Sequence, residues 1–131
     1  MTVARRLTRH LVVAAFAILL LPSVGAGHHP GSHATRASDG AVQLDVAAVV
    51  ADACTTIASV TRGAPSGVTP PPGSTPVLVR LQRDDSQPCA VVVSVARSTT
   101  VLNIGPGVRH IHLYVVGMDG QLVSSERVPV H

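Results

Sequence analysis

Lysine and tryptophan are absent from this chain, and aromatic residues make up only 2% of its 131 residues. Charged residues reach 13%, which is about half the share of an ordinary soluble protein. Without lysine the chain cannot form a lysine Schiff base or bind phosphate in the manner of a P-loop. It also lacks the G-x-S-x-G, H-E-x-x-H and G-x-G-x-x-G motifs. We therefore expect a protein that is not an enzyme.

The net charge of +3 comes from the N-terminal segment. Arg5, Arg6 and Arg9 lie within the first ten residues, whereas all seven acidic residues lie beyond position 38. Removal of that segment would leave seven arginines to balance seven acids. A neutral chain with so few aromatic rings offers neither the charge nor the stacking surface that nucleic acids require. We therefore expect no nucleic-acid partner.

The first 26 residues are typical of an export signal. The basic head is followed by an apolar run, 11–21, then by Pro22 and by the small residues Val24, Gly25 and Ala26. A run of 11 residues is too short to span a bilayer core of ~30 Å. We predict a cleaved signal peptide (1–26), a periplasmic or extracellular location and no transmembrane segment in the mature chain. The alternative is a buried N-terminal helix.

Cys54 and Cys89 are the only cysteines, and an exported protein meets an oxidising compartment. A redox-active pair normally lies close together in the sequence, as in C-x-x-C, whereas these two residues lie far apart. The sequence therefore predicts one structural disulfide.

The mature chain divides at Gly40. Residues 27–40 are rich in small and polar residues with three histidines, which predicts a flexible arm. From 41 to 131, short valine-rich runs alternate with turn residues, which is typical of an all-β domain. Residues 63–76 contain three consecutive prolines and predict an extended surface loop. The expected strands are 42–50, 54–61, 77–82, 89–97, 100–104, 108–116 and 122–130.

Seven short strands and one disulfide predict a small immunoglobulin-like β-sandwich of about seven antiparallel strands. A small β-barrel is the alternative. Both faces of 89–97 are apolar, which favours a central position for that strand. Asp119-Gly120 predicts a hairpin with a two-residue loop between the last two strands.

Cleavage after Ala26 would create a candidate metal site at the new N-terminus. Gly27, His28 and His29 would supply the amine, two amide nitrogens and the His29 ring, a square-planar set that suits Cu(II) or Ni(II). The alternative is a solvated histidine-rich arm without a ligand.

A second candidate site lies on the last two strands. His110 and His112 share one strand face at roughly 6–7 Å, which would let both rings reach one Zn or Cu ion. A two-residue loop at 119–120 pairs 131 with 108 and brings His131 beside His110. The alternative is a polar, exposed strand face, since a register slip of one residue moves His131 to the other face.

The segment 101–130, with its Asp119-Gly120-Gln121 turn, is similar to the closing hairpin of the small periplasmic curli-assembly chaperones. That resemblance implies an immunoglobulin-like sandwich that keeps amyloid subunits soluble. The closely spaced cysteines of some members are absent here.

These observations together favour an exported binding module with a protein partner. Contact would be made through an exposed strand edge or through the proline-rich loop, possibilities that we leave open here. No cofactor is required by this interpretation. The alternative function is a periplasmic or secreted metal-binding protein that uses Cu, Ni or Zn.

Overall fold

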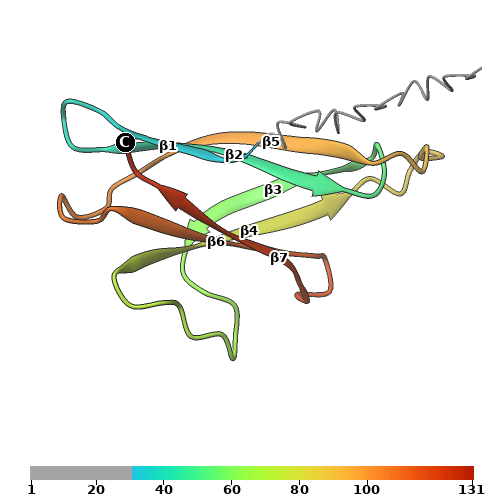
Figure 1. Ribbon diagram of the computed structural model, residues 1–131. Helices are drawn as coiled ribbons and strands as arrows, with labels where there is room; N and C mark the ends of the chain where they lie inside the picture. Colours follow the sequence, from blue (N-terminus) through green and yellow to red (C-terminus); the bar gives the residue numbers. More distant parts are fainter. Residues whose placement is uncertain (1–30) are drawn as a thin grey trace, which may run out of the picture.

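Residues 31–131 are the part of the chain that this computed structural model describes. They form seven β-strands and no helix, in two facing layers (Figure 1). The all-β prediction is therefore confirmed. The strands are β1 (His33–Arg36), β2 (Val42–Val50), β3 (Thr55–Arg62), β4 (Ser74–Arg83), β5 (Ser94–Leu102), β6 (His110–Val116) and β7 (Leu122–Pro129).

One sheet has the strand order β1-β2-β5 and the other has the order β3-β4-β6-β7. The sheets face each other as a sandwich, and the alternative of a closed barrel is not formed by the described residues. All pairs are antiparallel except β4 and β6, which are parallel. The expectation of a wholly antiparallel sandwich is wrong at this pair. Its cause is the path of the chain, which leaves β4, runs through β5 in the other sheet and returns to β6 in the original direction.

The core lies between the two sheets and follows from alternation along each strand. In β2 every second residue is buried, because successive side chains of a strand point to opposite faces. Leu44 from β2, Val77 from β4 and Ile111 from β6 are each fully buried. The inner faces therefore consist of aliphatic side chains, mostly valine, that suit a pleated and buried surface.

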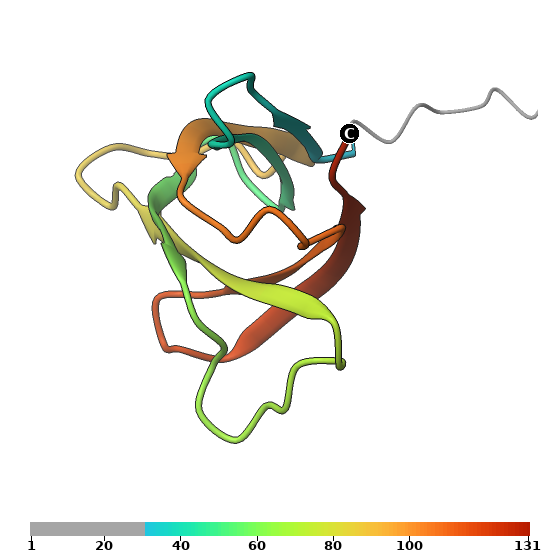
Figure 2. The same cartoon turned by 90° about the vertical axis from the view of Figure 1, so that its left-hand side faces the viewer.

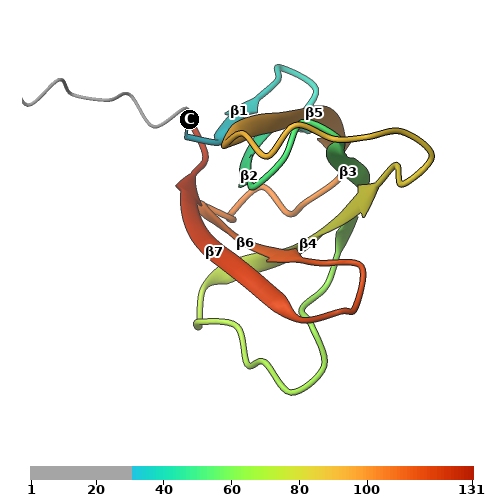
Figure 3. The ribbon, with the colours of Figure 1, turned by 90° about the vertical axis from the view of Figure 1, so that its right-hand side faces the viewer.

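The segment 27–40, expected to be a flexible arm, contributes a strand. His33–Arg36 form β1 and pair with Val42–Asp45 of β2. Beyond β7 the C-terminal residues continue onto β1, where Val130 forms a parallel bridge with Ala34. The two sheets are thereby joined on one side of the sandwich (Figure 3).

The strand expected at 89–97 is displaced. The structure has one strand, β5, at Ser94–Leu102, which replaces the two that we expected at 89–97 and 100–104. Cys89 is held in the disulfide with Cys54, and Val91–Val93 are exposed between that anchor and β5. β5 is also an edge strand and not a central one, because only β2 pairs with it.

The hairpin between β6 and β7 has a three-residue loop and not the expected two-residue loop. Gly117 bonds to the carbonyl oxygen of Gln121, and Gly120 has a φ of 77°. This conformation is typical of a type I turn followed by a left-handed glycine. A bulge between Val115 and Val116 then absorbs one residue of β7, Val123. The predicted register therefore holds from Val115 back to His110, with Leu113 opposite Glu126.

The proline-rich loop packs on the outer face of the second sheet (Figure 2). Ala64 and Val68 contact a small cluster formed by Leu78, Tyr114 and Val116. These contacts hold the segment against β4 and β6, so it is a covering loop and not a free excursion. β4 also begins at Ser74, earlier than expected, and includes Pro76 at the point where pairing with β3 ends.

Candidate binding sites

The disulfide lies at one end of the sandwich. Cys54 and Cys89 are joined, with their Cα atoms 5.7 Å apart, which confirms the predicted pair. Neither cysteine lies in a strand: Cys54 precedes β3, and Cys89 lies between β4 and β5. The bond therefore joins two loops and does not cross the core.

Asp52 organises the loop that carries Cys54. Its Oδ1 accepts hydrogen bonds from the Cys54 backbone N–H and the Thr55 hydroxyl, both at 2.9 Å. Its Oδ2 lies 3.4 Å from Nε of Arg83. The Thr55 hydrogen bond is the main reason that the pKa of Asp52 lies below its usual 3.8, with backbone bonds and Arg83 acting in the same direction and partial burial opposing them. The cysteine loop is thus held by an ionised carboxylate.

A slot opens between the second half of β2 and the first half of β7. It consists of two adjoining cavities of about 400 and 410 Å³ that share Val49 and Val123. Core side chains line it, with Leu81 in one cavity and Leu113 in the other. We call this feature the β2–β7 slot. It offers a mostly apolar surface that reaches the interior of the sandwich, with the carboxylates of Asp52 and Glu126 in its lining.

In the part of the chain that the structure describes, both strands beside the slot have an edge without a strand partner. β1 pairs with β2 only as far as Asp45, so within the described residues Val46–Val50 have β5 as their single strand partner. Ala47 donates its N–H to the Ser32 hydroxyl at 3.0 Å. Two residues further on, the backbone of Val49 faces the same side, because alternate residues of a strand bond to the same neighbour. This edge can accept another strand.

The surface around the slot is unusually apolar. Val49 is 54% exposed, Val93 is 75% exposed and Val123 is 56% exposed. Contiguous exposed apolar side chains mark interaction sites in soluble proteins. From the sequence we expected Val93 in a central strand and did not predict the slot. The available signals were the valine run after Cys89 and the adjacent apolar pair at the start of β7.

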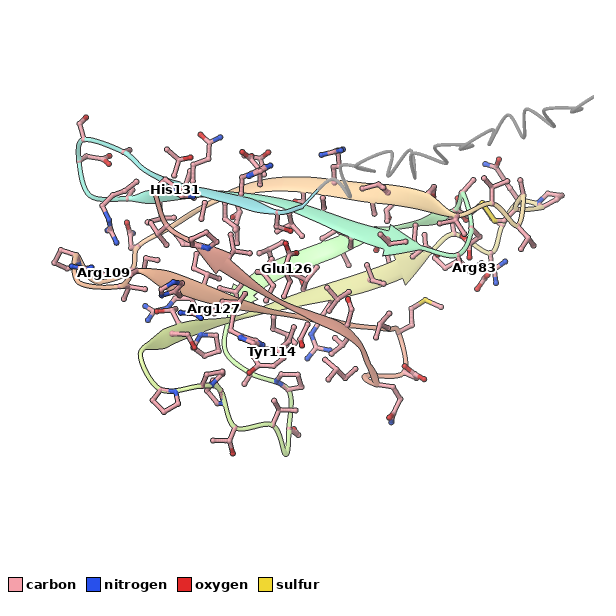
Figure 4. The ribbon with its side chains drawn as sticks, in the orientation of Figure 1. Arg83, Arg109, Tyr114, Glu126, Arg127 and His131 are labelled. Carbon is pink, nitrogen blue, oxygen red and sulfur yellow. A yellow bond between two sulfur atoms is a disulfide. The ribbon has the colours of Figure 1, made fainter. Side chains whose placement is uncertain are left out.

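Glu126 and Ser32 lie at the slot's other end. The backbone N–H of Ser32 donates to Oε1 of Glu126 at 3.2 Å. Glu126 points from β7 toward β1 and β2, whereas Arg127 and Tyr114 lie on the opposite side of their sheet (Figure 4). This bond explains why a carboxylate is accommodated opposite Leu113, as the predicted register requires.

His110 and His112 share the outer face of β6, as predicted, and are half-buried. A guanidinium nitrogen of Arg127 lies 3.0 Å from Nε2 of His110. The ring of His112 packs against Tyr114, with centroids 4.7 Å apart. Both histidines and Arg127 line a hollow of about 270 Å³ under the proline-rich loop.

His131 is not brought together with these two histidines. Its backbone N–H donates to the carbonyl oxygen of Ala34 at 3.0 Å, which places the terminal residue on β1. No group of three histidine, cysteine or acidic side chains that could hold a metal ion is found within residues 31–131. Gly27, His28 and His29 lie outside the described residues, and Cu(II) or Ni(II) binding there stays a prediction.

Comparison of the chain with protein-family models, with curated proteins and with solved structures found no match. Within residues 31–131 there is also no helix that could cross a membrane.

Proposed function

We propose that this chain is an exported binding module that takes up an extended, apolar segment of a partner protein. The segment would pair with the edge of β2 around Val49, which has no strand partner on that side within residues 31–131, and place alternate side chains in the β2–β7 slot. This mode is β-strand addition, in which backbone hydrogen bonds supply affinity and pockets for alternate side chains supply specificity.

The observation that carries this proposal is that a strand edge without a partner in residues 31–131 lies beside a mostly apolar slot. A free edge alone is common, and proteins usually protect it with charge, with proline or with a covering segment. Here Val46–Val50 contain no charged residue or proline, and the side chain of Val49 among them is exposed. Extended apolar segments are exposed by unassembled or unfolded subunits, so a chaperone-like role belongs to the same proposal.

Export and the immunoglobulin-like character of the sandwich are part of the proposal. Export is supported by the leader pattern and by the Cys54–Cys89 disulfide, since disulfides persist in oxidising compartments. Seven strands in two sheets support the immunoglobulin-like comparison, and the parallel β4–β6 pair is where this topology departs from it.

This proposal can be tested before the partner protein is known. A displayed library of random ten-residue peptides would be selected against the exported protein, and apolar residues at alternate positions are expected among the binders. Val123→Asp should weaken binding at least tenfold, because it places a charge in the slot. Val49→Pro should do the same by removing the outward N–H while leaving the bonds to β5 intact.

Val101→Asp is the matched control. Val101 is 66% exposed, close to the 56% of Val123, but lies on β5 and does not line the slot. Peptides that bind both aspartate variants equally well, or a selection that yields no binder, would contradict strand addition at this slot.

A further inference from the structure

The hollow under the proline-rich loop is a second, separate site. Its wall is a tight turn from Pro71 to Ser74, in which the Ser74 N–H donates to the Pro71 carbonyl oxygen. Pro72 and Gly73, with a φ of 78°, occupy the two central positions, as a type II turn requires. The Ser74 hydroxyl bonds to the same carbonyl at 2.7 Å and closes the turn. Histidines and an arginine form the remaining lining.

The lining carries positive charge without a counter-charge. The lining contains no carboxylate, because it consists of residues 71–74, His110, His112 and Arg127. Within residues 31–131 the recorded ion pairs involve Arg83 alone, so Arg127 has no acidic partner there. An arginine fork that is not engaged by a protein carboxylate matches the geometry of a bound carboxylate or phosphate.

The hydrogen bond between Arg127 and His110 opposes a metal ion at this place. A guanidinium has only donors, so Arg127 donates to the lone pair of His110 Nε2. That lone pair is the one that this nitrogen would offer to a metal ion. The guanidinium charge beside it also repels a divalent cation.

His112 adds a donor. Its Nδ1 is buried and has no hydrogen-bond partner in the described part of the chain. Since a buried N–H without an acceptor is rarer than a buried acceptor without a donor, we place a ring proton on the other nitrogen, Nε2. His112 is half-buried and thus contributes an N–H beside the Arg127 fork, which is exposed at the rim of the hollow.

We propose that this hollow binds a small oxyanion, a phosphate or a carboxylate, through Arg127 and His112. The site lies on the outer face of the β3-β4-β6-β7 sheet and does not depend on the proposed strand addition. Arg127 supplies charge-assisted hydrogen bonds, His112 supplies an N–H donor, and the proline-rich loop limits access to ligands of small size.

The experiment is a ¹H–¹⁵N NMR titration of the exported protein with inorganic phosphate and with acetate at constant ionic strength. Shifts are expected at Gly73, His112 and Arg127. Arg127→Gln should weaken binding of the better anion about tenfold or more, the effect expected from loss of charged hydrogen bonds. Arg127→Lys keeps the charge but loses the fork, and an intermediate affinity is expected.

Arg97→Gln is the matched control, because Arg97 is an exposed strand arginine on the other sheet. It should change the affinity less than twofold, and circular dichroism with thermal melting should show that all variants remain folded. Three results would overturn the proposal: no shift with either anion, an equal loss in the Arg97 variant, or Zn(II) binding that needs both histidines and survives Arg127→Gln.

Discussion

The backbone N–H of Arg36 donates to the carbonyl oxygen of His131 at 2.7 Å, and this bond holds His131 against β1. The final residue lies on β1 and not beside His110. Arg36 also donates from its side chain to the carbonyl oxygens of Gly40 and Val108, each at 2.9 Å. One arginine thus connects β1, the following turn and the loop before β6.

Replacement of Arg36 should therefore lower stability. Arg36→Ala removes the charge-assisted hydrogen bonds to the carbonyl oxygens of Gly40 and Val108. The change is expected to lower the free energy of unfolding by about 2 kcal/mol. Urea denaturation measures this cost. Arg97→Ala, at an exposed arginine with no recorded hydrogen bond, should stay within about 0.5 kcal/mol of the parent. Equal effects of the two changes would show that the Arg36 bonds contribute nothing.

Loss of the disulfide should have a larger effect. The bond between Cys54 and Cys89 closes a loop with a sequence separation of 35. The Cys54→Ser/Cys89→Ser double variant should lose roughly 4 kcal/mol, because the unfolded chain regains the entropy of that loop. The measurement is urea denaturation of both proteins under oxidising conditions. A loss below about 1 kcal/mol would contradict the structural role of the disulfide.

The displaced valine run gives a sharp test of the fold. Leu44 is fully buried in β2, so Leu44→Ala should cost about 2–5 kcal/mol through lost burial and cavity formation. Val91 is 89% exposed, and Val91→Ala should change stability by less than about 0.5 kcal/mol. If Val91→Ala were as costly as a core substitution, residues 89–97 would form the buried strand that we expected from the sequence.

Stability should depend on the ionisation of Asp52. Its pKa in the folded chain lies below 3.8, so the unfolded chain binds more protons between the two values. The stabilisation by the ionised Asp52 is complete at a pH above 3.8. It is lost as the pH falls through the lowered pKa of Asp52 in the folded chain. Urea denaturation at about pH 7 and about pH 2.5 should show this loss.

Thr55→Val supplies the comparison for Asp52. This change keeps the side-chain shape but removes the hydroxyl that contributes most to the lowered pKa of Asp52. The acid-dependent loss of stability should therefore be smaller than in the parent protein. An unchanged pH dependence would show that Asp52 is not the responsible group.

Copper binding tests the N-terminal prediction. A mature chain that starts at Gly27 should bind one Cu(II), measured by visible absorption, and His29→Ala should abolish the square-planar set. The His110→Ala/His112→Ala variant should bind equally well. An intact mass that does not start at Gly27, or copper binding that depends on the strand histidines, would contradict this prediction.

Much of the fold could be predicted because alternation and turn chemistry are local properties. Val42–Val50 alternate regularly, and β2 has those bounds in the structure. The register of β6 and β7 was also predictable, although the loop has three residues and not two. The loop is one residue longer than predicted, and the bulge at Val123 takes up one residue of β7. His110, His112 and Arg127 therefore keep the predicted register between β6 and β7.

The rest depends on contacts that are distant in the sequence. β1 could not be predicted, because His33–Arg36 contain a single apolar residue, Ala34, and acquire their partners only from β2 and the C-terminus. The slot was missed for the same reason, since it is lined jointly by β2 and β7, which are distant in the sequence and belong to different sheets. The Arg127–His110 bond follows from register, but its consequence for metal binding needed the observed geometry.

Because β1 is completed by the last residue of the chain, the sandwich cannot finish closing until synthesis has ended. A ribosome-bound or partly translocated chain lacks the segment that occupies the outer side of β1. Such a chain remains open along one whole flank, which suits a protein that must be threaded through an export channel before it adopts its final shape.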